Sequence, residues 1–298
     1  GTTGKVNEYN TVSGNEIFNF SQHGILVAIT GNGGNWNISG NSFYNNLGTP
    51  PSGLQRGITI LAGDYSSENV VSGNYIGGQA ALCGGSNWVN TGTSSFYGIL
   101  MSASFYSFNN ISNNTIKNIS RTNTGTGDLV GINISGGVAN VTGNTIGDPD
   151  PAISLSSASQ NFSRKLEGIR VTSSYSFSNI EENTITNLIL TGTSGYPEAS
   201  GIYIYSAHLR NNKITGIGHT TSSTLTPYIN GIYIYGVSGA SNDIINNVIA
   251  IDGGLSSDPE IYGLYDDSYS TNSYFFYNNS FSISGTANVS STTCAFFR

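Results

Sequence analysis

The amino-acid sequence predicts an all-β fold, a right-handed parallel β-helix (a solenoid) of about nine turns with about 33 residues in each turn. Three observations lead to this prediction. The composition is poor in helix-forming residues, two short phrases alternate along the chain, and apolar residues recur at fixed positions in both phrases. The right hand follows from the near-universal hand of parallel crossover connections. We expect one domain, residues 1–298.

The composition excludes an ordinary helical or α/β protein. Gly, Asn, Ser and Thr make up close to half of the 298 residues, and these residues are poor helix formers. Only 9% of the residues are charged, whereas globular domains average about 25%. Disorder is also disfavoured, because 37% of the residues are hydrophobic and 11% are aromatic, which is enough to build a core.

The first phrase centres on an asparagine, which we call the key Asn. From Asn15 to Asn279 the mean spacing between successive copies is 33 residues. The residues three positions before and two positions after the key Asn are apolar in every copy, which indicates a short strand on each side of it. The key asparagines are Asn15, Asn41, Asn74, Asn114, Asn144, Asn183, Asn212, Asn247 and Asn279.

The second phrase, Gly-Ile-x-apolar, alternates with the first and predicts a third strand in each turn. Its glycines are Gly24, Gly57, Gly98, Gly131, Gly168, Gly201, Gly231 and Gly263. Helical solenoids of similar period are excluded because no helical stretch separates the phrases. We expect the key Asn to sit at the corner in a left-handed conformation, with its amide bonded to the key Asn one turn away.

Charge and hydropathy exclude two classes of partner. The net charge is −7 and Lys plus Arg number only ten, so the chain has no cationic cluster for nucleic acid. The longest apolar run is about five residues, far below the roughly 20 that span a bilayer, so we expect no membrane insertion. No motif indicates a metal site or another cofactor.

Five tyrosines form the best binding candidate. Tyr203, Tyr233 and Tyr265 occupy the outward position of successive Gly-Ile strands, flanked by Tyr205 and Tyr235, so their rings should stack along one face. Aromatic faces suit sugar rings or a neighbouring domain. The alternative is that stacked tyrosines only stabilise a parallel sheet.

Catalytic candidates are weak. The outward positions of the Gly-Ile strands hold one arginine, Arg170, and no aspartate, which is a poor match to a polysaccharide lyase. Asp266 and Asp267 could form a hydrolase pair. We favour an acidic turn that interrupts the solenoid core.

The phrase NNTIKNIS, followed by a Ser/Gly/Thr loop and then GIYI, resembles the repeats of right-handed parallel β-helix proteins. More narrowly, the chain resembles the very large secreted surface proteins of Bacteroidota that carry a C-terminal type IX sorting domain, over residues 12–281. The resemblance implies an extracellular or cell-surface location and a repetitive segment whose neighbours are further repeats of a longer chain. Repeats cut at both ends, with no cap, agree with such a segment.

Two functional hypotheses follow. The favoured one is a non-catalytic structural or adhesive segment of a secreted cell-surface protein, which binds a polysaccharide or a cell-surface partner through an aromatic face. The alternative is a polysaccharide-degrading enzyme, namely a pectate-lyase-like enzyme, a glycosidase or a phage tailspike depolymerase. Fold alone cannot decide between them. A cluster of acidic and basic side chains in one surface groove would favour the enzyme.

Overall fold

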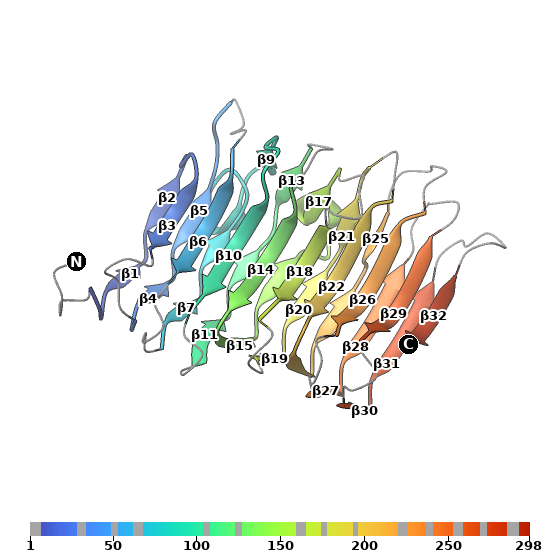
Figure 1. Ribbon diagram of the computed structural model, residues 1–298. Coiled ribbons are helices and arrows are strands. Elements are labelled where there is room, and N and C mark those ends of the chain that lie inside the picture. Colours follow the sequence, from blue (N-terminus) through green and yellow to red (C-terminus); the bar gives the residue numbers. More distant parts are fainter. Residues whose placement is uncertain are drawn as a thin grey trace.

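The computed structural model shows a parallel β-solenoid, which confirms the predicted fold class (Figure 1). Three long sheets run along the stack, and successive strands of each sheet come from successive repeats. The structure describes residues 7–28, 34–48, 53–61, 68–103, 108–122, 127–158, 165–173, 178–192, 196–219, 226–236, 241–252, 259–268, 273–284 and 292–298.

The entry sheet and the exit sheet lie on the two sides of the key asparagines. The entry sheet contains β1 (Thr11–Ser13), β4 (Asn37–Ser39), β7 (Val70–Ser72), β11 (Phe108–Ser112), β15 (Val138–Thr142), β19 (Ser178–Glu181), β23 (Ala207–Arg210), β27 (Ser241–Ile245) and β30 (Ser273–Tyr277). The exit sheet contains β2 (Glu16–Phe18), β5 (Ser42–Tyr44), β8 (Tyr75–Ile76), β12 (Thr115–Ile116), β16 (Thr145–Gly147), β20 (Thr184–Thr186), β24 (Lys213–Thr215), β28 (Val248–Asp252) and β31 (Ser280–Ser284).

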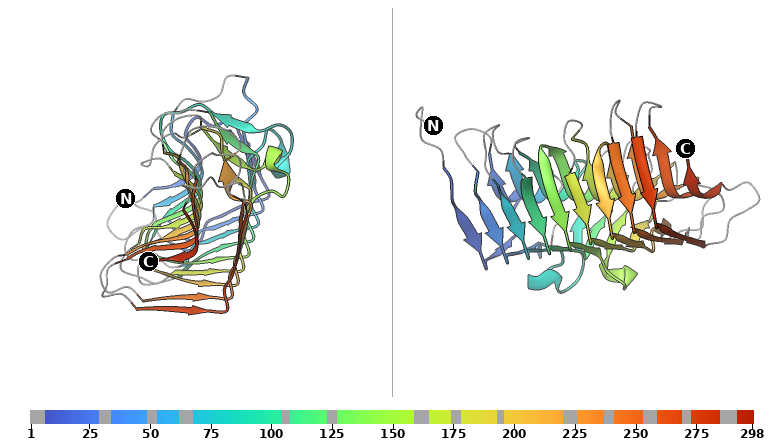
Figure 2. Two further views of the ribbon diagram at one scale, coloured as in Figure 1. Left: turned by 90° about the vertical axis from the view of Figure 1, so that its right-hand side faces the viewer. Right: turned by 90° about the horizontal axis from the view of Figure 1, so that it is seen from below.

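The third long sheet, the Gly-Ile sheet, is built from the second phrase. It contains β3 (His23–Val27), β6 (Gln55–Leu61), β10 (Phe96–Ser102), β14 (Leu129–Gly136), β18 (Lys165–Val171), β22 (Glu198–Ile204), β26 (Tyr228–Tyr235), β29 (Glu260–Asp267) and β32 (Thr293–Phe297). Figure 2 looks along the stack and from below, and the strands of each sheet lie one behind another in the first view.

The prediction of three strands per turn omitted a fourth, short sheet. It contains β9 (Trp88–Asn90), β13 (Ile119–Arg121), β17 (Leu155–Ser157), β21 (Leu188–Leu190) and β25 (Gly218–His219). Two 3-10 helices precede strands of this sheet, η1 (Ala81–Cys83) and η2 (Pro151–Ile153). Its strands are only two or three residues long, too short for a period-2 pattern to stand out in the sequence.

Stacked apolar side chains fill the interior. The residues three before and two after the key Asn lie in register from row to row, for example Ile111 with Val141 and Ile116 with Ile146. In the inner rows they are fully buried. The strands of the first and last rows alternate between exposed and half-buried residues because one side of each row is open. The fully enclosed stack is therefore shorter than the nine turns predicted.

The key asparagines form the predicted ladder. The backbone N–H and the side-chain Nδ2 of each key Asn donate to Oδ1 of the key Asn in the next row, at 2.9 to 3.1 Å, from Asn15 through to Asn279. From Asn41 onward Nδ2 also donates to a carbonyl of the entry sheet in the preceding row. The ladder therefore satisfies the polar groups that each corner buries.

The left-handed conformation at the corner falls one residue earlier than predicted. The residue before each key Asn has φ between 53° and 67°, and it is Gly or Asn in every row but one. Gly and Asn adopt this conformation most easily. The exception is Glu182, with φ 57°. The nine residues are Gly14, Gly40, Gly73, Asn113, Gly143, Glu182, Asn211, Asn246 and Asn278.

The glycine of the second phrase is required by a close approach between rows. A Cβ atom on any of the eight glycines would lie 2.5 to 2.7 Å from the carbonyl oxygen of the residue below it in the next row, as between Gly168 and Gly201. Real Cβ atoms do not come this close to backbone. Any side chain at this position would force the rows apart.

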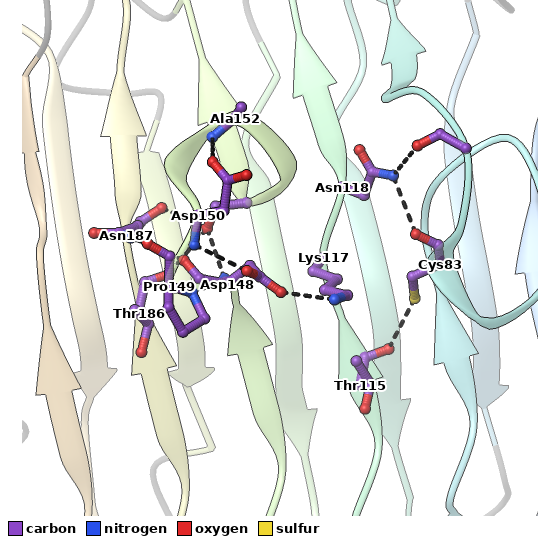
Figure 3. Close-up of polar contacts among 12 residues, drawn as sticks. Cys83, Thr115, Lys117, Asn118, Asp148, Pro149, Asp150, Ala152, Thr186 and Asn187 are labelled. Carbon is purple, nitrogen blue, oxygen red and sulfur yellow. Dashed lines mark hydrogen bonds and ion pairs between the residues drawn. The ribbon is translucent and has the colours of Figure 1, made fainter.

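A second type of corner joins the exit sheet to the short sheet (Figure 3). Asn118 and Asn187 adopt positive φ there, and the Nδ2 of each donates to two backbone carbonyls of the preceding row. Lys117 Nζ lies 2.6 Å from Asp148 Oδ2. Although burial acts to raise it, the pKa of Asp148 is held below its ordinary value by Lys117. The side-chain donors of both asparagines are thus paired with backbone, which gives this corner a structural role.

The ladder predicts that replacing Asn144 lowers the stability of the protein more than replacing Asn140, which lies outside the ladder. Asn144→Ala removes the acceptor of Asn114 and the donor to Ile111, and each buried polar group left unpaired costs about 1–3 kcal/mol. We expect the free energy of unfolding to fall by about 3 kcal/mol or more, measured by urea denaturation. Asn140→Ala is the control, because Asn140 is half-buried and bonds to Asn110 and Asn179 on the outward face. Equal losses for the two variants would contradict a structural role specific to the ladder.

Glu182 predicts a stabilising substitution. Its side chain is exposed, so Glu182→Asn loses no buried contact and places a residue that tolerates positive φ at this corner. We expect the free energy of unfolding to rise by about 1 kcal/mol, because the left-handed conformation costs an ordinary residue roughly 1–2 kcal/mol. Glu181→Asn, one residue earlier in β19, should give no such gain. A melting temperature that falls for Glu182→Asn would refute the argument.

Candidate functional site

The outward face of the Gly-Ile sheet changes its chemistry along the stack. The residue after the core Ile points outward in each strand, and the strands pair in register, so these residues form one column. The column starts with aliphatic and small polar residues, passes through Arg170, and ends in four aromatic residues. In order it reads Leu26, Thr59, Leu100, Asn133, Arg170, Tyr203, Tyr233, Tyr265 and Phe297.

The predicted stacking of Tyr203, Tyr233 and Tyr265 is confirmed. Their ring centroids are 5.1 Å apart at each step, with interplanar angles of 13° and 19°. Phe297, which the sequence analysis did not include, continues the stack at 5.1 Å and 5°. Tyr205 and Tyr235 form a second, tilted pair at 5.2 Å beside it.

The stack offers ring edges rather than ring faces to a ligand. A centroid spacing of 5.1 Å leaves no room for a further ring between neighbours, so each tyrosine covers the face of the next. At the start of the stack, Lys165 Nζ lies 4.4 Å from the Tyr203 centroid and 5.0 Å from that of Tyr233, within cation–π distance. A sugar ring therefore cannot lie flat on the inner tyrosines. It can meet their edges and hydroxyl groups.

Five ionisable side chains, which we call the charged cluster, lie beside the start of this stack. They are Asp128, Lys165, Glu167, Arg170 and Glu198. Arg170 Nη1 is 2.7 Å from Asp128 Oδ2, and Arg170 Nε donates to Glu167 Oε2. Lys165 Nζ is 2.8 Å from Glu198 Oε1. The Glu167 side chain has no exposed area, and the other four are at most 20% exposed.

Burial shifts the pKa values of three members of the charged cluster. It raises the pKa of Glu167, and the positive charges of Arg170 and Lys165 only partly oppose this effect. It raises the pKa of Glu198 in the same way against Lys165. For Arg170, burial alone would lower the pKa, but Glu167 and Asp128 outweigh it and raise the pKa above its ordinary value. Arg170 therefore keeps its proton and is unsuited to act as a base.

Two hollows open on this face. The first hollow, of about 220 Å³, is lined by four members of the charged cluster (all but Glu198) together with Thr172, Tyr203 and Tyr205. The second hollow, of about 160 Å³, is lined by Glu198, Asn230 and Glu260 and by Tyr228, Tyr233, Tyr262 and Tyr265. Both hollows therefore combine carboxylates with tyrosine edges.

The structure does not bring Asp266 and Asp267 together as a hydrolase pair. Both belong to β29, and consecutive residues of a strand point to opposite faces. Asp266 is buried, in register with Ile234 of the apolar column, and its Oδ2 lies 3.3 Å from Arg298 Nε. Asp267 is exposed and accepts a hydrogen bond from Tyr233 Oη at 3.0 Å. Asp266 thus interrupts the apolar column as expected, but the two aspartates belong to a strand and not to the predicted acidic turn.

The charged cluster was not predicted from the sequence, because only Arg170 among its members occupies the position after a core Ile. Leu166 and Ile169 both belong to the core, although three positions separate them. The alternation therefore changes phase at Gly168, and Glu167 comes to lie on the same outward face as Arg170. The residues KLEGIR carried the only available signal, a charged residue on each side of the Gly-Ile phrase.

No group of three or more His, Cys, Asp or Glu residues within the described ranges is arranged to hold a metal ion. No helix among these residues is long and apolar enough to cross a membrane.

Comparison with known proteins gives no family: no protein-family model, no curated protein and no solved structure matches the chain.

The buried carboxyl of Glu167 predicts a pH dependence of stability. Its raised pKa means that the folded protein keeps this proton at pH values where the unfolded chain, near the ordinary value of 4.5, has lost it. The folded state then binds more protons, so stability falls as pH rises through the folded pKa. We expect Glu167→Gln, which lacks this titration, to gain stability relative to the wild type as pH rises above about 4.5.

Urea denaturation of both proteins over a pH series measures this difference. Glu182→Gln, which removes an exposed carboxylate, is the control for loss of one negative charge. Stability curves that run parallel for the wild type and Glu167→Gln would rule out a raised pKa at Glu167.

Proposed function

We propose that this chain is a non-catalytic structural and adhesive segment of a secreted cell-surface protein, and that it binds glycans through the outward face of the Gly-Ile sheet. One observation carries the proposal: the tyrosine stack, the charged cluster and both hollows occupy this single face of the solenoid. Sugars bind where hydrogen-bonding groups and aromatic side chains meet in a concave site.

The structural part of the proposal is supported by the uniformity of the stack. The Asn ladder and the glycine contacts repeat from row to row, which suits an extended and stiff segment. The repeat phrases resemble those of secreted surface proteins of Bacteroidota with type IX sorting domains. On that resemblance we place the chain in a longer repetitive protein at the cell surface.

A glycan suits this face better than a nucleic acid does. The protein carries a net charge of −7, and the two cations of the charged cluster, Lys165 and Arg170, are already paired with carboxylates. A nucleic-acid groove needs cations that are free to neutralise phosphates. A neighbouring protein domain remains the other kind of partner that an aromatic face suits.

A polysaccharide-degrading enzyme is the second candidate, and one observation favours it. Glu167 and Glu198, both with raised pKa, line the first and the second hollow respectively, and a carboxyl of raised pKa is suited to general acid catalysis. Against it, Asp266 and Asp267 face opposite ways and Arg170 keeps its proton. Assays for reducing sugars and for unsaturated products on a polysaccharide panel separate the two candidates.

The glycan proposal is tested at the exposed part of the tyrosine stack. We expect Tyr233→Ser combined with Tyr265→Ser to weaken binding of the best ligand on a glycan array by about tenfold or more, because aromatic anchors dominate such contacts. Tyr75→Ser, on the outward side of the exit sheet, should leave binding unchanged. Circular dichroism checks that each variant is folded. Unchanged glycan binding by the double variant would remove the second hollow and the exposed part of the stack as the binding site, and a protein partner lost instead would favour domain docking.

A further inference from the structure

One oxygen of the charged cluster lacks a hydrogen-bond partner. Glu167 Oε2 accepts from Arg170, but Glu167 Oε1 is buried and has no partner among the residues that the structure describes. A buried oxygen left in this state costs about 1–3 kcal/mol. Glu167 lines the first hollow, but its side chain has no exposed area, so a ligand in that hollow would supply the missing partner after a rotation of the carboxyl toward it.

The fold itself does not require a carboxyl at this position. The residues in register with Glu167 in the adjacent rows are Val130 and Ser200, and Asn230 follows. The same strand therefore forms with an aliphatic, a hydroxyl or an amide side chain here. The energetic cost at Glu167 is thus a local departure from the repeat, and such departures are expected at functional sites.

The charges of the first hollow select against a charged ligand. Lys165 and Arg170 are both paired, with Glu198 and with Asp128 and Glu167. A ligand carboxylate would have to compete with these pairs. A ligand ammonium group would meet Lys165 and Arg170, and the two carboxylates of the hollow, Asp128 and Glu167, are already paired with Arg170. The described residues hold no group of carboxylates arranged for a metal ion. Each of these ligands would lose more by desolvation than it gains here.

A hydroxyl group meets the requirement of Glu167 in either protonation state. It can donate to Oε1 when the carboxyl is ionised, and it can accept from Oε1 when the carboxyl is protonated. Thr172 and Tyr205, which line the same hollow, carry hydroxyl groups of their own. The hollow measures about 220 Å³, below the roughly 300–1,000 Å³ of sites for larger ligands, so it suits a single sugar unit.

We propose that the first hollow is a subsite for one unit of an uncharged, hydroxyl-bearing glycan, with a sugar hydroxyl bonded to Glu167 Oε1. This inference rests on the proposed glycan-binding function and adds the chemical class of the ligand and the residue that selects it. Glu167 contacts the ligand directly, and Arg170 positions Glu167 through Oε2.

The test compares two substitutions of Glu167 on a panel of sugars. The probes are neutral oligosaccharides (β-glucan, mannan and xylan fragments) and acidic ones (oligogalacturonate and oligoguluronate), with affinities measured by calorimetry. Glu167→Gln keeps a donor and an acceptor and should bind the neutral ligand within about threefold of the wild type. Glu167→Leu removes both and should bind it at least about tenfold more weakly. Glu181→Leu, on β19 of the entry sheet, is the matched control.

Each possible result supports or overturns the proposed subsite. Neutral binding lost only in Glu167→Leu supports the subsite. Neutral binding equal in the wild type and Glu167→Leu overturns the subsite and leaves the proposed glycan-binding function standing, as does binding of acidic glycans alone. Binding of no glycan by the wild type overturns both. If Glu167→Leu fails to fold by circular dichroism, the same comparison is made with Glu167→Ser, the residue found at the register position of Ser200, whose shorter side chain does not reach the place of Oε1.

Discussion

Every feature of this solenoid depends on the hydrogen bonds between the key asparagines, because they fix the register of one row on the next. Each Oδ1 receives two donors from the neighbouring row, so a shifted row would leave buried donors unpaired. A slip of one residue would also turn the apolar side chains outward. The left-handed residue before each key Asn, together with the glycine that lets rows approach closely, makes that register compatible with the backbone.

Because the register is fixed, residues at equivalent positions of successive rows form continuous columns. A local site arises where a few neighbouring rows carry different side chains in such a column. Where neighbouring rows carry tyrosine, the rings must stack at the spacing of the strands. Where Arg170 interrupts the column, its guanidinium meets the carboxylate of Asp128, from a residue 42 positions earlier in the chain. The charged cluster and the tyrosine stack therefore arise from the same geometry as the apolar core, with different side chains at outward positions.

This geometry explains what the sequence could predict. The sheets, the Asn ladder and the stacking of Tyr203, Tyr233 and Tyr265 follow from phrases that repeat, so period and spacing were sufficient. The charged cluster depends on a change of phase at Gly168, which places Glu167 outward although strict alternation from Ile169 would place it inward. Asp266 and Asp267 were adjacent in sequence and yet face opposite ways. The short sheet was missed because its strands hold too few residues to show a period.

The charged cluster points to a function because charged residues are rare in this chain and yet five of them lie together. Only 9% of its residues are charged, and most outward positions of the Gly-Ile sheet are filled without them. Five ionisable groups nevertheless gather at one point, where burial disfavours the ionised form of two carboxyls. Burying such groups seldom adds stability over apolar side chains of similar size, and Val130 occupies the position of Glu167 one row away. A requirement of the fold does not account for the cluster, whereas the proposed recognition of a hydroxyl-rich ligand would.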